Sequence, residues 1–303
     1  MGTYALSTKP LQKISKSFRR LRWSSARWFQ NTISVRTSQG LFTVSSADQC
    51  IGKALFCSGQ HELGLVRDST SLLQRLGRFP KNGKGTIVDL GANVGPISIG
   101  FLNLGLADKA IAVEPDPTNF SLLERNVAQN DLQECMICLP YAVSDCATQV
   151  QFELCDWNPG DHRVRCSGAK CASSDMYDEQ DRTVIDVPCE QIDKLLQDIP
   201  DEYVEQINLV WIDVQGHEGQ VFRGGANLFA RDIPVMAEIW PYGLDRSGMS
   251  QDEFCDVARH FWSEYWRPED LNPEALPIAS LSSLIDTLRT EGRFENVIFL
   301  SAS

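Results

Sequence analysis

A glycine-rich segment, VDLGANVG at residues 88–95, has the residue types of a turn that binds a ligand. The apolar run at 86–90 predicts a strand, and the pattern from about 94 to 104 predicts a helix after it. Glycines between a strand and a helix permit unusual φ and ψ angles and let a ligand approach the backbone closely. In doubly wound sheets, ligands bind at the carboxyl ends of the strands. Periodicity alone is compatible with several kinds of nucleotide-binding turn.

Two carboxylates narrow the choice of ligand. Asp89 stands directly before the turn, and Glu114 ends the next predicted strand, residues 111–115. The turn reads GxNxG rather than GxGxxG, so the second glycine that admits a pyrophosphate is missing. A carboxylate before the turn suits a ligand with an ammonium and a sulfonium group, and Glu114 can accept hydrogen bonds from both ribose hydroxyls. These features favour S-adenosylmethionine (SAM) over NAD, whereas the alternative is a tight turn beside an unrelated acid.

Several segments together resemble, in order and spacing, the FkbM-type family of class I SAM-dependent methyltransferases. They lie within about residues 50–242 and read VDLGANVG, AVEPDP, YAVSD, NPGDHR and WIDVQGHEGQVFRGG. The first is shared by many class I methyltransferases, and the IDVQGHE segment is more specific. The resemblance implies a doubly wound, Rossmann-like α/β fold: a mostly parallel seven-stranded sheet with one antiparallel strand, and helices on both faces. It also implies O-methylation of a hydroxyl on a small molecule or a sugar.

The resemblance assigns cofactor contacts by position. Asp213 would lie beside the transferring methyl group. The other expected contacts are Asp89, Gly91, Asn93 and Gly95 to the methionine part of SAM, Glu114 to the ribose, and Ala142, Val143 and Ser144 near the adenine. Two positions depart from the family pattern: Trp211 stands where a lysine is common, and Gln215 replaces the commoner glutamate.

Methyl transfer to an alcohol needs a group that positions the acceptor and removes its proton. His217 follows Asp213 closely at a predicted strand end, Glu238 ends another predicted strand, and His162 lies in the NPGDHR segment. We therefore expect His217 or Glu238 to activate the acceptor and Asp213 to orient it, with His162 as a further candidate. Each histidine could instead be structural, and Glu238 could make only a structural hydrogen bond.

Strand and helix patterns alternate along the chain, which predicts a mostly parallel sheet covered by helices on both faces. We expect a basic N-terminal extension at 1–32, a small β-rich lead-in with a helix at 33–82, and the SAM-dependent methyltransferase domain at 83–303. Within this domain, 135–143 reads as one strand and 156–182 as a polar, loop-like insertion. Arg163 and Arg165 in the insertion could bind an anionic acceptor or pair with a carboxylate.

The charge is unevenly distributed. The net charge of −12 argues against a general nucleic-acid binder, which needs a basic surface. Residues 1–30, however, carry seven Lys or Arg side chains and no acid. This segment is either a frayed terminal helix or an amphipathic helix that makes weak contact with an anionic membrane surface or a protein.

Ten cysteines, including a CxxC at Cys135 and Cys138, allow three interpretations: apolar packing, a metal site or redox chemistry. Packing is favoured and no metal is expected, because the pair falls in or beside a strand-like run. No secretory signal or membrane-spanning run is apparent, so we expect a cytoplasmic protein. Two other functions stay open, a catalytically silent SAM-binding or partner-binding module and an NAD-dependent oxidoreductase. The sequence does not indicate an oligomeric state.

Overall fold

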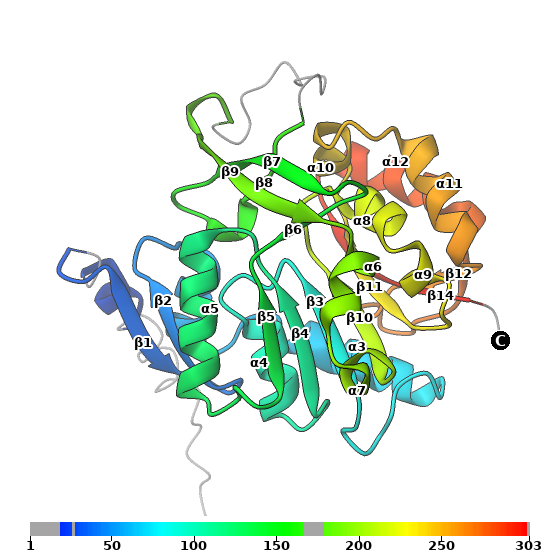
Figure 1. The fold of residues 1–303 in the computed structure, drawn as a ribbon. Coiled ribbons are helices and arrows are strands. Elements are labelled where there is room, and N and C mark those ends of the chain that lie inside the picture. Colours follow the sequence, from blue (N-terminus) through cyan, green and yellow to red (C-terminus); the bar gives the residue numbers. More distant parts are fainter. Residues whose placement is uncertain (1–18, 26–27, 167–178, 302–303) are drawn as a thin grey trace, which may run out of the picture.

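A mixed eight-stranded sheet forms the centre of the molecule in the computed structural model, which describes residues 19–25, 28–166 and 179–301 (Figure 1). The five strands β3, β4, β5, β10 and β11 are parallel, whereas β14 is antiparallel to both of its neighbours, β11 and β12. In spatial order the strands are β13 (Leu276–Pro277), β12 (Glu264–Trp266), β14 (Glu295–Leu300), β11 (Val235–Ile239), β10 (Ile207–Ile212), β3 (Thr86–Leu90), β4 (Lys109–Val113) and β5 (Met136–Leu139).

The predicted doubly wound α/β class is confirmed, but the expected strand count was wrong. The eighth strand is β13, a two-residue strand that pairs antiparallel with β12 at the sheet edge. Two strands, β13 and β14, therefore oppose the parallel direction instead of one. Pro277 lies in β13 and lacks the N–H that a further neighbour would need, which suits it to an edge.

Alternate residues along the strands face two separate hydrophobic cores. In β3, Ile87 belongs to one core, while Val88 and Leu90 belong to the other. The first core also takes side chains from α2 (Ile51–Ser58), α3 (Leu63–Arg75), α4 (Pro96–Asn103) and α5 (Pro117–Gln129). The second takes side chains from α6 (Ile192–Leu195), α7 (Asp201–Val204), α8 (Glu218–Gly224), α9 (Ala226–Phe229), α10 (Pro241–Arg246), α11 (Gln251–Phe261) and α12 (Leu281–Glu291).

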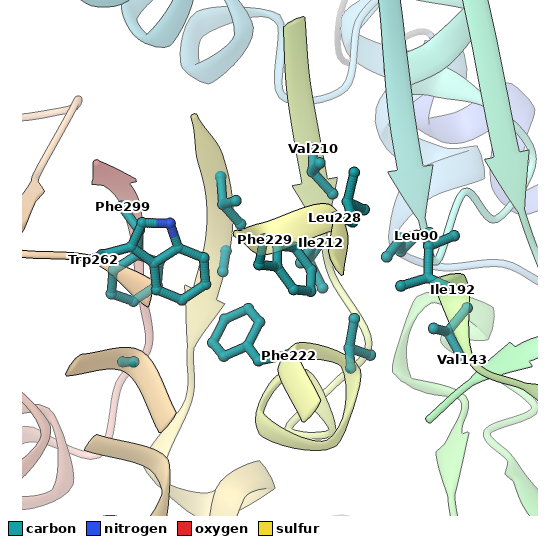
Figure 2. Packing of buried hydrophobic residues seen from close by; sticks show 14 of the residues in the cluster. Leu90, Val143, Ile192, Val210, Ile212, Phe222, Leu228, Phe229, Trp262 and Phe299 are labelled. Carbon is teal, nitrogen blue, oxygen red and sulfur yellow. The ribbon is translucent and has the colours of Figure 1, made fainter. Parts of the chain in front are cut away.

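Aromatic rings fill the second core. Phe222 of α8 lies at its centre, with the rings of Phe229 and Trp262 at centroid distances of 5.5 and 4.8 Å (Figure 2). Trp262 also stacks on Phe299 of β14 at 4.8 Å. Because large rings bury much apolar area and hold defined geometries, this cluster fixes helix α8 against β10 and β14. The loop between β10 and α8, which carries the IDVQGHE segment, is thereby held at the carboxyl ends of the parallel strands.

A second sheet of four strands covers the carboxyl ends of the main sheet. Its order is β6 (Ala142–Val143), β9 (Thr183–Glu190), β7 (Thr148–Leu154) and β8 (Arg163–Val164). The predicted single strand at 135–143 is therefore two strands: β5 ends at Leu139, Pro140 follows, and β6 joins the second sheet. The predicted loop at 156–182 contains β8 and two short 3-10 helices, Pro159–Asp161 and Glu179–Asp181, and its residues 167–178 lie outside the described chain. Two more 3-10 helices span Leu196–Asp198 and Ile278–Ser280.

The lead-in is more helical than the sequence suggested. β1 (Thr32–Arg36) and β2 (Leu41–Ser45) form an antiparallel pair, but α2 and α3 occupy most of 51–75, a region read as β-rich up to residue 67. Apolar residues from these elements enter the first core, so a surface of the main domain is covered by the lead-in.

Part of the basic N-terminal segment is described. Trp23 is buried and its ring lies 5.4 Å from that of Phe56, which attaches this segment to α2. Leu21, Trp28 and Phe29 are exposed. Residues 1–18 and 26–27 of the predicted basic segment lie outside the described residues. Within the described ranges, no helix has the length and apolar character needed to cross a membrane.

Candidate functional site

Three neighbouring parallel strands, β4, β3 and β10, end level at one edge of the main sheet, and β11 continues two residues further; this edge defines the site. The last level row across β4, β3, β10 and β11 is Val113, Leu90, Ile212 and Ala237. One step beyond this row come Glu114, Gly91, Asp213 and Glu238 in the same order. Three carboxylates thus flank a glycine at the edge where doubly wound folds bind ligands.

Gly91 allows the chain to turn between these carboxylates. Its φ is +89°, and a Cβ atom there would lie 1.9 Å from the carbonyl oxygen of Asp213. Since any side chain would clash with backbone, only glycine fits. Asn93 also has a positive φ, +51°, and its Nδ2 donates to the carbonyl oxygen of Pro159 at 3.0 Å. The turn is therefore tied to the loop that follows β7.

Asp89 has a different position from the one expected. It lies on the face of β3 that includes Ile87, toward α4, and its Oδ2 accepts hydrogen bonds from the Ser98 backbone N–H and hydroxyl. Gly95 is the N-cap of α4 and has no side chain to satisfy the free N–H groups there. Asp89 supplies that acceptor from the neighbouring strand. Burial raises the pKa of Asp89 to about 7, although the bonds from Ser98 oppose this shift.

Two neighbouring hollows lie over the strand ends. The one that we call the inner pocket has about 600 Å³ of space free of atoms, and the outer cavity has about 1000 Å³. The inner pocket is lined by residues that include Gly91, Asn93, Val113, Glu114, Tyr141, Ala142, Val143, His162, Val214 and His217. The outer cavity is lined by residues that include His61, Glu62, Trp157, Asn158, Asp161, Glu238, Trp240, Arg293 and Phe294. Both hollows share Ile51, Gly160, Asp213 and Gln215.

The structure brings most of the residues expected at the site to these hollows. Gly91, Asn93, Glu114, Ala142, Val143, His162, Asp213 and His217 line the inner pocket, and Glu238 lines the outer cavity. Three expected cofactor residues, Asp89, Gly95 and Ser144, do not line either hollow. A Cβ on Gly95 would lie 2.7 Å from Leu123 and 2.9 Å from Ile99, so this glycine serves the packing of α4.

Glu114 is held in place by backbone groups. Its Oε2 accepts from the Asn93 N–H at 2.8 Å, and its Oε1 accepts from the Asp116 N–H at 2.9 Å. The residue is 4% exposed, and burial raises its pKa to about 8. At pH 7 the ligand-free carboxyl is therefore mostly protonated, and a ligand that donates hydrogen bonds to it favours ionisation.

The two candidate histidines both line the inner pocket and not the outer cavity. The Cys155 N–H donates to Nδ1 of His162 at 2.9 Å, which leaves the proton of the neutral ring on Nε2. Nε2 of His217 lies 2.8 Å from the Ser144 hydroxyl, and its buried Nδ1 has no hydrogen-bond partner among the described residues. Burial lowers the pKa of each to about 4, so both rings are neutral at pH 7.

The two remaining candidates, Asp213 and Glu238, face the outer cavity together. Oδ1 of Asp213 accepts from Nε2 of Gln215 at 2.6 Å. Glu238 is 9% exposed, and no described residue donates a hydrogen bond to its carboxylate or pairs with it. Burial raises the pKa of both, and in Glu238 the charge of Asp213 adds to this effect.

A buried ionic cluster joins the second sheet to the wall of the outer cavity. Arg163 of β8 lies within 3.7 Å of both Glu153 and Asp161, and 3.0 Å from Glu179. Its guanidinium also lies over the rings of Trp240 and Tyr242, at 5.5 and 5.7 Å. Of the two alternatives for Arg163, the structure therefore shows pairing with carboxylates. The same holds for Arg165, which lies 3.6 Å from Glu153.

Several residues of the outer cavity were missed in the sequence. His61 and Glu62 come from the lead-in, where no motif marks them, and Trp240 follows the candidate Glu238 without a distinguishing pattern. Asp161 lies in the NPGDHR segment, so the segment itself was a signal. Among the described residues, no disulfide forms and no group of three His, Cys, Asp or Glu is arranged to hold a metal ion. Cys171 lies outside them.

Comparison with known proteins assigns the chain to a family. The family model "Methyltransferase FkbM domain" matches residues 89–263, more than half of the chain. The protein belongs to this family. A curated relative, methyltransferase sdnD from Sordaria araneosa, is 26% identical over 205 residues, which cover 61% of this chain and 78% of the relative. The family-model match begins within β3, just before the Gly91 turn. It includes Gly91, Glu114, Asp213 and Glu238, the residues that follow the last level row of the sheet.

Solved methyltransferases are also similar. Methyltransferase FkbM from Methylobacillus flagellatus KT is 14% identical with a TM-score of 0.37, over 60% of this chain but only 40% of that one. The M. jannaschii tRNA m1G37 methyltransferase is 10% identical with a TM-score of 0.40, over 91% of this chain and 56% of that one. Likenesses at this level do not indicate a substrate.

Proposed function

We propose that this FkbM-family protein is a SAM-dependent methyltransferase that binds SAM in the inner pocket and its acceptor in the outer cavity. One observation carries the proposal: both hollows are lined by Asp213, Gln215, Gly160 and Ile51, and we propose that they open into each other there, so that a donor in one faces an acceptor in the other. Transfer between two bound molecules requires this kind of shared opening, because their reacting atoms must come within about 3–3.5 Å.

The lining of the inner pocket has groups that can bind SAM. The buried carboxyl of Glu114 can accept hydrogen bonds from the ribose hydroxyls, and Gly91 leaves room for close approach to the backbone. The buried Nδ1 of His217, which no described residue satisfies, is available to a polar edge of the ligand. Asp213 at the opening is an acid suited to the positive charge of a sulfonium. When bound, SAM supplies a methyl group already activated by that charge.

For the acceptor, we propose a hydroxyl group on a small molecule or a sugar. In the outer cavity, Glu238 accepts the proton of that hydroxyl, while Asp213 beside it orients the oxygen toward the opening. Glu238 suits this role by its position, because it lines the outer cavity and no described residue pairs with its carboxylate; burial raises its pKa, which makes the carboxylate a stronger base than an exposed one. His162 and His217 are instead proposed as cofactor contacts, since neither lines the outer cavity.

The first experiment measures binding and turnover separately. Thermal unfolding is followed with S-adenosylhomocysteine (SAH) and with NAD; stabilisation by SAH alone is expected. SAM is then incubated with a panel of hydroxyl-bearing small molecules and sugars, and SAH formation is measured. Acceptor-dependent SAH formation supports the enzyme. Binding without turnover for any acceptor would support the catalytically silent module instead, and stabilisation by NAD rather than SAH would favour the oxidoreductase.

Glu238→Gln tests the role of the base within the same assay. Removal of a general base is expected to lower kcat about 10²–10⁴-fold while SAH affinity stays unchanged, because Glu238 does not line the inner pocket. Glu124→Gln, which makes the same chemical change on an exposed position of α5, is the matched control. Turnover of Glu238→Gln at the rate of this control would contradict the assignment.

A further inference from the structure

The outer cavity carries more acidic groups than the reaction uses. Four carboxylates line it: Glu62, Asp161, Asp213 and Glu238. Asp161 pairs with Arg182 and lies 3.7 Å from Arg163. Within the described chain, the other three carboxylates have no Lys or Arg partner that could offset their charge.

The basic groups at the cavity wall do not change this balance. Arg293 pairs with Glu291 and Glu295, so its charge is already offset. His61 lies 3.9 Å from Glu62, but burial lowers the pKa of His61 to about 4 and leaves it neutral at pH 7. A cavity lined by one sign of charge concentrates ligands of the opposite sign.

The proposed reaction accounts for two of the three unpaired acids. Asp213 lies at the opening, where the sulfonium of the donor would face it, and Glu238 receives the hydroxyl proton. Glu238 is nine-tenths buried and without a partner among the described residues, and it lines the cavity, so its carboxylate is available to a ligand there. Glu62 is left over. It is the N-cap of α3, comes from the lead-in, and its side chain is 35% exposed.

Burial raises the pKa of Glu62 to about 7 and raises the pKa of Asp213 and Glu238, so a positively charged occupant would favour their ionised forms. The chemistry of the lining favours an organic cation as this occupant. A metal ion does not fit, because no three His, Cys, Asp or Glu side chains of the described residues are arranged to share one. Trp157 and Phe294 also line the cavity with rings that are 45% and 51% exposed. Aromatic rings beside carboxylates are the surroundings that bind alkylammonium groups.

We propose that the natural acceptor carries a positively charged amine near the hydroxyl that is methylated, and that Glu62 binds this amine. This inference rests on the proposed function, because it assumes that the outer cavity holds the acceptor. Glu62 is then a specificity-determining residue that the lead-in supplies to the outer cavity. The class of acceptor is an amino alcohol, which includes amino sugars.

The test uses a pair of probes that differ only in charge. Choline bears a hydroxyl and a permanent positive charge, and 3,3-dimethylbutan-1-ol is its neutral isostere. Their dissociation constants are measured by ligand-observed NMR with full-length protein saturated with SAH. Choline is expected to bind at least about fivefold more tightly at low salt, and this preference should decrease as salt screens the charges.

Variants assign the preference to Glu62. Glu62→Gln is expected to reduce the preference for choline at least about threefold, whereas Glu124→Gln on α5 should retain it. SAH affinity verifies that each variant is folded. If Glu62→Gln does not fold, the salt dependence of the wild-type preference for choline tests whether the charge of the cavity causes that preference.

Three results would overturn the inference: equal affinity for the two probes, a preference for choline that salt does not change, or no detectable binding of either probe. An unchanged preference in a folded Glu62→Gln would do the same. Failure of SAH itself to bind would instead contradict the proposed function, so the two failures are distinguishable.

Discussion

The substitution Glu114→Gln separates the binding of SAM from the stability of the fold. Burial raises the pKa of Glu114 to about 8, so the ligand-free protein holds this carboxyl mostly neutral at pH 7. Glutamine resembles the neutral carboxyl in shape and keeps one acceptor oxygen for the Asn93 or Asp116 N–H. The other N–H loses its acceptor, so the free energy of unfolding is expected to fall by about 1–3 kcal/mol, the cost of one buried donor left unsatisfied.

The binding of SAH should weaken independently of this cost to the fold. The ribose hydroxyls donate to an ionised carboxylate in the proposed complex, and hydrogen bonds to a charged group contribute about 1.5–3 kcal/mol. Glutamine cannot ionise, and its amide N–H₂ would face a hydroxyl with another donor. Since 1.4 kcal/mol is a factor of ten, the Kd for SAH is expected to rise about 10–100-fold.

Isothermal titration calorimetry measures this effect and a second signature. Because the wild-type carboxyl ionises on binding, SAH should release a proton at pH 7, and the observed heat should depend on the ionisation enthalpy of the buffer. Glu114→Gln should lose that dependence. The control Glu124→Gln should behave as wild type in both respects. A Glu114→Gln protein with wild-type affinity, or a wild type without proton release, would refute the reasoning.

Three further predictions follow from the same contacts. Asp89→Ala removes the acceptor of two bonds from Ser98 and should lower the free energy of unfolding by about 1–3 kcal/mol, with a near wild-type Kd for SAH in calorimetry; a selective loss of affinity would contradict the structural role. Gly91→Ala places Cβ against the Asp213 carbonyl and should lower the thermal midpoint and abolish SAH binding, and wild-type behaviour would show that the turn can move. Between pH 6.5 and 8 the ligand-free protein should lose up to about 2 kcal/mol of stability as pH rises, measured by urea unfolding. Buried carboxyls, Glu114 above all, have folded pKa values raised to about 7–8, so in this window they bind more protons in the folded state than in the unfolded state. The three histidines with lowered pKa oppose this loss by up to about 0.4 kcal/mol each, because near pH 6.5 they are still partly protonated in the unfolded state. A flat profile would contradict the carboxyl shifts.

The sequence predicted the core of the fold because its physical signals are local. The runs that became β3, β10 and β11 are apolar on both faces, as parallel strands between two helical layers must be. A strand that changes sheets gives no comparable signal. At 135–143 the apolar run is continuous, and only Pro140 marks the point where the chain leaves the main sheet for the second one.

The sequence predicted the functional site less completely than the fold, for similar physical reasons. A motif identifies Asp89 but does not say where its carboxylate points. Strand alternation could have indicated the answer, because Asp89 shares a face with Ile87, on the side of α4. Glu62 and His61 reach the outer cavity through the tertiary packing of the lead-in, and no spacing in the sequence relates them to Glu238. Glu114, Asp213 and Glu238, by contrast, could be predicted from the sequence, because the carboxyl ends of neighbouring parallel strands lie at the same edge of the sheet.

The most direct test of the central claim is a crystal structure of the full chain with bound SAH. We predict that the ribose of SAH contacts Glu114 in the inner pocket, and that its sulfur lies beside Asp213 and faces the outer cavity. SAH bound elsewhere, or in the inner pocket with its sulfur directed away from the outer cavity, would contradict this claim.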